Sequence, residues 1–311
     1  MKALQRFGPF KSGRFNRGSI FILCGLFQFV FGRLNGQSAD SLAIASPGTI
    51  LFEIRMDANS PVSYLFGTHH AFGKSFFDSF PKAKEKLLSS TLLITEMKKS
   101  DTTAVSIINA RKEITPWRDY LKKENLAYMQ NLLEPSELDF GKVYPAELFA
   151  LTNRYHTEKT CKTKSEEDPK GSLDDYIYSL AKENKLKTMG LETPAEQLKL
   201  INEDIAGMPR RIHRRRLNNL MDQLKSGNTT SCSEARKYAG MGFGLELDKP
   251  CTNSLMLTDR NNAWMTILED KLKSESCFIA VGLSHLMYEC GLVSQLQGKG
   301  FSVSSVPVHS K

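Results

Sequence analysis

The sequence predicts an α/β protein with a central, mostly parallel mixed sheet that is flanked by helices and carries a helical insertion in the middle of the chain. Short apolar runs of strand length are the first observation. Phe278–Val281, for example, is aromatic or β-branched apart from one alanine and carries no charge, as in a strand buried on both faces of a parallel sheet. The second observation is that helical patterns separate most of these runs, which is typical of α/β folds.

The strand pattern recurs along the chain. Ile50–Arg55 and Val62–Phe66 flank a turn at Asp57–Pro61, so they are expected to form a hairpin. Ser79 and Pro81 are typical of the start of the helix that follows. The remaining strands are expected at residues 91–95, 187–191, 278–281 and 301–308, the last of them an edge strand.

Helical patterns fill the rest of the chain. Residues 117–185 are helical with polar interruptions and are interpreted as a helical layer or insertion. Thr193-Pro194-Ala195-Glu196 is a capping box with proline in the first turn, so a helix begins there. Asp259–Trp264 begins another helix, and Ser284 is expected to cap a helix over His285–Gln297.

The distribution of charge argues against nucleic acid as a partner. The chain has 42 Lys and Arg against 34 Asp and Glu, but residues 1–38 hold six of the basic residues and no acidic one. The rest of the chain is therefore almost balanced in charge. The basic run Arg210–Arg216 precedes leucines at helical spacing, so it is interpreted as the solvated face of an amphipathic helix.

Residues 1–38 have the layout of a secretory signal peptide, and residues 39–311 are expected to form the α/β domain. A basic segment precedes the apolar stretch Ile20–Phe31, and small or polar residues follow it. The mature protein is therefore expected to be periplasmic or secreted, beginning between about Ser38 and Ser41. The alternative is an uncleaved signal anchor, which would be the chain's only association with a membrane.

Five cysteines follow the signal segment: Cys161, Cys232, Cys251, Cys277 and Cys290. In an oxidising compartment some of them should form disulfides. Cys232 and Cys251 flank a glycine-rich loop and are the first expected pair, with Cys277 and Cys290 the second. No close-spaced metal-binding motif occurs, so a metal site would have to be assembled from distant parts of the chain.

Two histidines follow buried strand patterns with the same spacing. Gly282-Leu283-Ser284-His285 and Gly67-Thr68-His69-His70 both have a glycine at the end of the strand and a histidine three residues later. Each alone is as well explained by a histidine packed in a turn or core. Two matches at opposite ends of the chain favour His70 and His285 meeting at the edge of a sheet where open α/β folds bind ligands.

Two carboxylates also follow strand patterns directly. Glu96 comes after the run 91–95, and Glu192 after the run 187–191. A solvated strand end or a helix cap would explain either of them in structural terms. Glu196 is accounted for as a cap residue, whereas Glu96 and Glu192 are candidate functional residues.

Several segments together resemble the TraB/GumN family, which is related to the TIKI proteases and more distantly to erythromycin esterase and ChaN. They are YLFGTHH, the strand that ends in Glu96, SLDDYIYSLAKENKLKTMGLETPAEQL, DRNNAW and FIAVGLSHLMYECGLVSQLQGKGFSV. The resemblance covers about residues 50–308. It implies an active site of His70, His285, Glu96 and Arg260, with Glu192 matching a family glutamate.

The chain departs from the family pattern near the second histidine. Leu283-Ser284 stands where alanine and glycine are common, and Tyr288-Glu289-Cys290 stands where a glycine-rich run is common. These departures affect the expected shape of the turn and leave the histidine itself in place.

The residues and the resemblance together predict a metal-dependent hydrolase, of the metallopeptidase kind, acting on a peptide or protein. His70, His285 and Glu96 would hold a divalent ion with one position open for water. Glu96 or Glu192, whichever is not a ligand, would be the general base, and Arg260 would stabilise the oxyanion. The resemblance implies manganese or cobalt, with zinc as a further candidate. His69 should point to the other side of the extended chain.

Two other functions remain open at this stage. The same fold would serve as a non-catalytic module that binds a peptide or haem, as the family resemblance also implies. An esterase-like hydrolase that needs no metal and uses His70 as base is the other alternative. The sequence predicts neither the substrate nor the oligomeric state.

Overall fold

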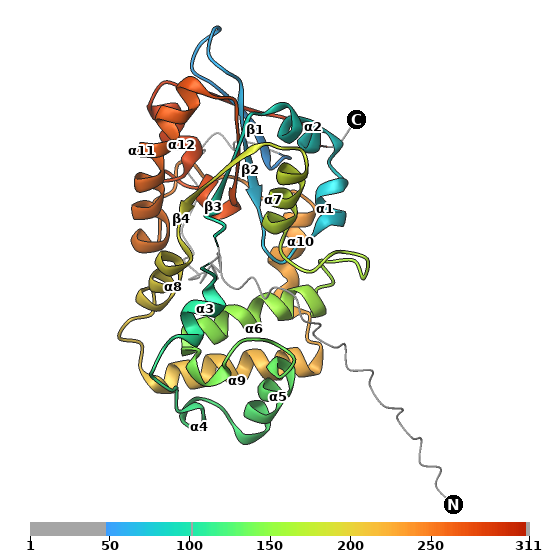
Figure 1. Cartoon of the computed structure of the whole chain (residues 1–311), viewed down its shortest axis with the longest axis vertical. Coiled ribbons are helices and arrows are strands. Elements are labelled where there is room, and N and C mark those ends of the chain that lie inside the picture. Colours follow the sequence, from blue (N-terminus) through green and yellow to red (C-terminus); the bar gives the residue numbers. More distant parts are fainter. Residues whose placement is uncertain (1–47, 101, 309–311) are drawn as a thin grey trace, which may run out of the picture.

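In the computed structural model, which describes residues 48–100 and 102–308, a sheet of six strands forms the centre of the molecule (Figure 1). The order across the sheet is β4-β3-β5-β2-β1-β6. β2, β3, β4 and β5 run parallel, whereas β1 is antiparallel to both β2 and β6. The mostly parallel mixed sheet predicted from the sequence is confirmed. The strands are β1 (Leu51–Arg55), β2 (Ser63–Thr68), β3 (Leu92–Met97), β4 (Lys187–Glu192), β5 (Cys277–Gly282) and β6 (Ser302–Ser305).

Helices cover both faces of the sheet. Both faces carry apolar side chains that need cover, because alternate residues of a strand point to opposite sides. Leu93, Phe278 and Ala280 belong to one apolar core, and Ile94, Ile279 and Val281 belong to the other. The first core is closed by α1 (Lys74–Asp78), α2 (Pro81–Ser89), α7 (Leu173–Glu183) and α10 (Ser233–Ala239). The second is closed by α11 (Asp259–Ser274) and α12 (Leu292–Gly298) on the opposite side of the sheet (Figure 1).

A third apolar core belongs to a group of helices at one end of the molecule (Figure 1). Its members are α3 (Ala104–Asn109), α4 (Trp117–Tyr120), α5 (Lys123–Leu133), α6 (Pro145–Thr160), α8 (Pro194–Glu203) and α9 (Arg210–Ser226). We refer to these helices as the helical module. They do not coincide with the segment 117–185, because α7 packs on the sheet and α9 packs on α6. The leucines of α9 are buried and Arg210 and Arg211 exposed, as predicted.

The chain after β5 differs from the expected helix over His285–Gln297. A 3₁₀ turn spans Leu283–Leu286, and α12 begins only at Leu292. Tyr288 adopts a left-handed conformation with φ of 70°, which interrupts any helix through this region. Ser284 therefore caps no α-helix. The capping box at Thr193 and Glu196 is present as predicted.

The described residues form two disulfides, with a pairing other than the one expected. Cys161 at the end of α6 pairs with Cys232 just before α10, and Cys251 pairs with Cys290, with Cα–Cα distances of 5.4 and 6.0 Å. The expectation of Cys232–Cys251 and Cys277–Cys290 was wrong. Cys277 begins β5 and Cys290 lies beyond its other end, so a strand that rises about 3.3 Å per residue separates them. The thiol of Cys277 is buried and free.

No helix within residues 48–100 and 102–308 is long and apolar enough to cross a membrane. The expected signal peptide, residues 1–38, lies outside the described part of the chain.

Peptide mapping without reductant should recover Cys161 linked to Cys232 and Cys251 linked to Cys290. Cys277 should be alkylated only after denaturation, because burial hides its thiol and raises its pKa to about 11. Recovery of a Cys232–Cys251 or a Cys277–Cys290 peptide would contradict this pairing.

Candidate functional site

Four parallel strands bring the predicted site residues to one edge of the sheet. Glu96 lies in β3 and Glu192 ends β4, while His70 and His285 follow β2 and β5 closely. The register pairs Thr68 with Gly282, so the two histidine segments leave the sheet side by side. All four side chains are buried. Their convergence agrees with the general position of ligand sites at the carboxyl ends of parallel strands.

Arg260, in the first turn of α11, lies at the centre of this group. Its Nε and Nη2 donate to the two oxygens of Glu192 at 2.7 and 2.8 Å. Nη2 also donates to Glu96 Oε2 at 3.1 Å, and Nη1 donates to His285 Nε2 at 3.0 Å. The guanidinium therefore contacts three of the predicted site residues while it is itself buried.

Glu192 is held by four donors. Besides the two from Arg260, Trp264 Nε1 donates to Oε1 at 2.9 Å and Gln197 Nε2 donates to Oε2 at 3.3 Å. These bonds use most of the acceptor capacity of the Glu192 carboxylate, so it has little room for a further hydrogen-bond donor. In this conformation Glu192 orients Arg260, and a role in proton transfer would require the arginine to move.

The ring of His285 is fixed in one tautomer. Nδ1 lies 2.7 Å from Asn261 Oδ1, an acceptor, and Nε2 lies 3.0 Å from a nitrogen of Arg260 that is always a donor. The proton is therefore on Nδ1, and Nε2 presents its lone pair. Burial and then the charge of Arg260 lower the pKa of His285 to about 3, so the ring is neutral near pH 7.

His70 has a different partner and different electrostatics. Its Nδ1 lies 2.6 Å from Asp174 Oδ2, and Thr68 Oγ1 donates to the other oxygen of Asp174 at 2.7 Å. Burial alone would lower the pKa of His70, but the charge and hydrogen bond of Asp174 and the charge of Glu96 raise it overall. Nε2 of His70 is buried without a hydrogen-bond partner.

Glu96 approaches the backbone closely. Gly282 N donates to its Oε1 at 2.5 Å, and a Cβ at position 282 would lie 3.0 Å from the same oxygen. Gly282 has a φ of −54°, so the glycine is needed here for this close approach and not for an unusual turn. Burial raises the pKa of Glu96, but the charges of His285, Arg260 and His70 lower it overall.

Two residues that orient the histidines were not predicted individually from the sequence. Asp174 is in the first turn of α7 and Asn261 in that of α11, inside the SLDDY and DRNNAW segments. The adjacent Asp175 completes the capping box with Ser172 and binds Lys99. Only the structure separates the role of Asp174 from that of Asp175.

The three other histidines of the described residues, His69, His156 and His213, serve packing. His69 contacts the rings of Phe72 and Tyr238 at 5.2 Å each, and its burial lowers its pKa to about 4. His156 lies 3.2 Å from the carbonyl oxygen of Asn228, and His213 contacts Tyr120 edge-on. None of them contacts Arg260, Glu96 or Glu192 in the hydrogen bonds of the described residues.

A comparison with protein families matches the TraB/PrgY/gumN family model over residues 50–305. The chain belongs to the TraB/PrgY/gumN family. The match includes all six strands and every residue of the site described above. No curated protein matches the chain.

The divalent ion implied by the resemblance to the TraB/PrgY/gumN family fits the chemistry of these side chains. His70 has a buried Nε2 with no partner, and a carboxylate holds its other nitrogen, as is common for metal-binding histidines. His285 carries its proton on Nδ1, which leaves Nε2 as the donor atom. In the described residues, however, no three such side chains are grouped closely enough for an ion. Arg260 contacts both His285 Nε2 and Glu96, so it must turn away before both can bind one.

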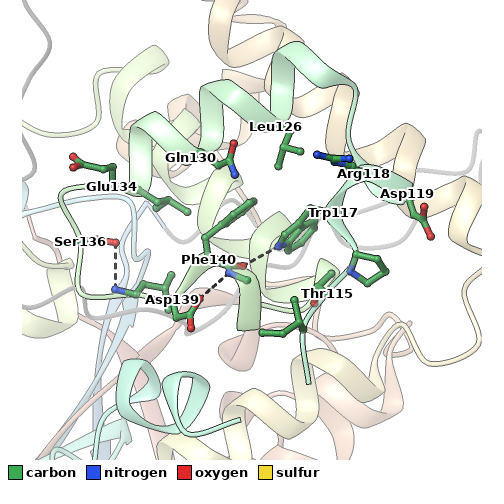
Figure 2. A pocket seen from close by; sticks show the side chains of 15 residues that line it. Thr115, Trp117, Arg118, Asp119, Leu126, Gln130, Glu134, Ser136, Asp139 and Phe140 are labelled. Atoms are coloured by element: carbon green, nitrogen blue, oxygen red, sulfur yellow. Dashed lines mark hydrogen bonds between the residues drawn. The ribbon is translucent and has the colours of Figure 1, made fainter. Parts of the chain in front are cut away.

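A groove lies elsewhere, on the helical module of this TraB/PrgY/gumN family member. It has a volume of about 730 Å³ and is lined by residues of α4, α5 and the loops beside them. Figure 2 shows Trp117 and Phe140 among the side chains that line it. Their rings are stacked, with centroids 4.9 Å apart. The groove contains none of the predicted site residues.

Replacing Glu192 with alanine should lower the free energy of unfolding of the metal-free protein by about 3–5 kcal/mol, because Arg260 stays buried without its main anionic partner. Urea unfolding in the presence of a chelator measures this. Glu203→Ala, which removes an exposed ion pair with Lys199, is the matched control and should change the value by less than about 1 kcal/mol. Equal effects of the two substitutions would contradict the central place of the Arg260–Glu192 pair.

Proposed function

We propose that the protein is a metal-dependent hydrolase of the metallopeptidase kind, in which His70, His285 and Glu96 hold one divalent ion. The observation that supports this most is the state of the two histidines. Each has Nδ1 held by a side-chain oxygen, from Asp174 or Asn261. Nε2 of His70 is buried without a partner, and Nε2 of His285 lies 3.0 Å from Arg260 Nη1 and 3.9 Å from Glu96 Oε1. A buried ring nitrogen without a partner, as at His70 Nε2, is uncommon in a histidine that serves packing alone.

The protein's own groups have separate tasks in this proposal. His70 and His285 supply nitrogen ligands, and Asp174 and Asn261 keep those rings in the correct tautomer. Glu96 supplies a carboxylate oxygen that Gly282 N–H holds in place. A bound divalent ion would lower the pKa of a water molecule and polarise the substrate carbonyl.

Arg260 would stabilise the negative charge that develops on the carbonyl oxygen. Its guanidinium is anchored to Glu192 by two hydrogen bonds and lies over the ring of Trp264 at 4.8 Å. Because the guanidinium is rigid and planar, Nη1 leaves His285 only when Glu192 moves together with Arg260 or one of their two hydrogen bonds is given up. Glu192 then acts by orienting the arginine, and its substitution should slow turnover more than it weakens binding of the ion.

We further propose a peptide or protein substrate and manganese or cobalt as the ion, with zinc as a further candidate, because the TIKI-like resemblance implies them. The two disulfides support an exported location, since such bonds persist in oxidising compartments.

A second candidate function is a hydrolase that needs no ion. His70 and Asp174 form a dyad in which the carboxylate raises the pKa of the histidine, and the free Nε2 would accept a proton from water or from a hydroxyl. Arg260 would then remain on His285 as in this structure.

His70→Ala and His285→Ala should each abolish stoichiometric Co²⁺ binding, because each removes one of three ligands. The visible absorption of bound Co²⁺ and metal analysis of dialysed protein measure this. Asp174→Asn should weaken binding by about 10–100-fold, as expected when the partner of a metal-binding histidine is lost. Glu96→Gln should also weaken the binding of Co²⁺.

His213→Ala is the control for the histidine variants and should bind Co²⁺ like the unsubstituted protein, because its ring lies in the helical module. If His70→Ala binds a full equivalent of Co²⁺ while His285→Ala does not, the two histidines do not share an ion.

Removal of divalent ions with a chelator should abolish hydrolysis of a peptide library, and added Mn²⁺ or Co²⁺ should restore it. Glu192→Gln is expected to keep the ion and turn over more slowly. Hydrolysis that persists in chelator but is lost in His70→Ala and Asp174→Asn would instead support the His70–Asp174 dyad. An ion retained without turnover of any peptide would favour a binding module.

A further inference from the structure

The Cys251–Cys290 disulfide is connected to His285 through a single side chain. Asn261 Nδ2 donates to the carbonyl oxygen of Cys290 at 2.8 Å and to that of His285 at 3.3 Å. Asn261 Oδ1 is also the acceptor for His285 Nδ1 at 2.7 Å. The backbone carbonyl of Cys290 therefore holds the side-chain amide of Asn261, and that amide in turn holds the imidazole of His285.

The disulfide joins two segments that have little regular structure of their own. Residues 287–291 and 242–253 contain neither helix nor strand. Besides the disulfide, two backbone hydrogen bonds hold them together, from Tyr288 N to Leu245 O at 2.8 Å and from Glu289 N to Lys249 O at 3.0 Å. Around the segment 287–291, Ser294 Oγ donates to the carbonyl oxygen of Tyr288 and Gln295 Nε2 to that of Cys290, at 2.9 Å each.

Backbone strain makes this restraint more important. Tyr288 has a φ of 70°, a conformation that is unfavourable for an aromatic residue and persists only where the surroundings impose it. Tyr288 lies between His285 and Cys290, and its amide is one of the two that bind the 242–253 segment. When the disulfide opens, this turn can relax and carry the Cys290 carbonyl away from Asn261.

We propose that the Cys251–Cys290 disulfide positions His285 through Asn261, and that reduction of this bond frees Nδ1 of the imidazole from its hydrogen bond to Asn261. Cys251, Cys290 and Asn261 are positioning residues and do not touch the reacting atoms. The assignment of His285 to a reaction rests on the proposed function, whereas the linkage itself rests on the hydrogen bonds above.

The redox step is an ordinary thiol–disulfide exchange. A dithiol reductant gives two electrons and two protons to the Cys251–Cys290 bond, which becomes two thiols, while the dithiol becomes a disulfide. A disulfide oxidant reverses the step when the chain reaches an oxidising compartment. The site is then completed only after oxidation.

The second disulfide provides a matched control. Cys161–Cys232 joins the end of α6 to the start of α10, and neither half-cystine bonds to Asn261 or His285 in the described residues. Its loss should cost stability through the unfolded state much as the loss of Cys251–Cys290 does. The state of the His285 ring distinguishes the two.

Long-range ¹H–¹⁵N NMR of the imidazoles tests the proposal on metal-free protein, with the His285 signals assigned from their absence in His285→Gln. The unsubstituted protein should show a protonated Nδ1 and an unprotonated Nε2. In the Cys251→Ser/Cys290→Ser protein the Nδ1 proton should lose its hydrogen bond, seen as an upfield shift and faster exchange with solvent, as in Asn261→Ala with both disulfides intact. Nε2 should stay unprotonated in all of them, because Arg260 still donates to it. The Cys161→Ser/Cys232→Ser protein should keep the unsubstituted pattern, although Tm falls by roughly 10 °C in both double variants.

Binding of Co²⁺ gives a second readout. Loss of Cys251–Cys290 should weaken it by about 10–100-fold, and loss of Cys161–Cys232 should leave it unchanged. If the Cys251→Ser/Cys290→Ser protein does not fold, the same spectra are recorded on oxidised protein during titration with dithiothreitol. The Asn261→Ala spectrum is then the reference for a released ring.

An unchanged His285 Nδ1–H signal after loss of Cys251–Cys290 overturns the proposal, and so does an equal change after loss of Cys161–Cys232. Failure of the proposed function has a different outcome. In that case the unsubstituted protein binds no Co²⁺, while its His285 Nδ1–H is still hydrogen-bonded in the oxidised state and released on reduction.

Discussion

The buried guanidinium of Arg260 is the interaction on which the rest of the site depends. Two glutamates from β3 and β4 and a lone pair of His285, in the 3₁₀ turn after β5, converge on it. Two buried carboxylates at one sheet edge would repel each other without a cation between them. The positive charge of the arginine allows β3, β4 and β5 to end in this way, and the bidentate bond to Glu192 keeps that charge in place. A bound divalent ion would add positive charge between these carboxylates and would replace contacts that the arginine now makes.

The two histidines share a spacing in the sequence but not an electrostatic state. Asp174 makes His70 more basic, whereas Asn261 is neutral and leaves His285 under the influence of burial and of Arg260. The repeated motif therefore supplies the position of each ring at the end of a strand. The character of each ring comes from helices α7 and α11, which pack on opposite faces of the sheet.

Much of the fold was predictable because buried strands have a distinctive apolar pattern and end at glycine or carboxylate residues. The meeting of His70, Glu96, Glu192 and His285 followed from the rule for parallel sheets. Features that depend on contacts between distant segments were not predictable. Asp174 and Asp175 are equivalent in the sequence pattern, and the cysteine pairing depends on where α6 and the segment 242–253 come to lie. The helix expected over His285–Gln297 does not form as predicted, because tertiary contacts impose the left-handed conformation of Tyr288.

The close approach of Gly282 to Glu96 limits how this site can change by substitution. The backbone amide at position 282 lies 2.5 Å from a carboxylate oxygen that is 186 residues away in the chain. Any side chain at position 282 would press on that oxygen, and a shorter acid at position 96 would open the space but lose the hydrogen bond. Positions 96 and 282 should therefore tolerate replacement only as a pair, and an engineered site with a larger residue at one must be redesigned at the other.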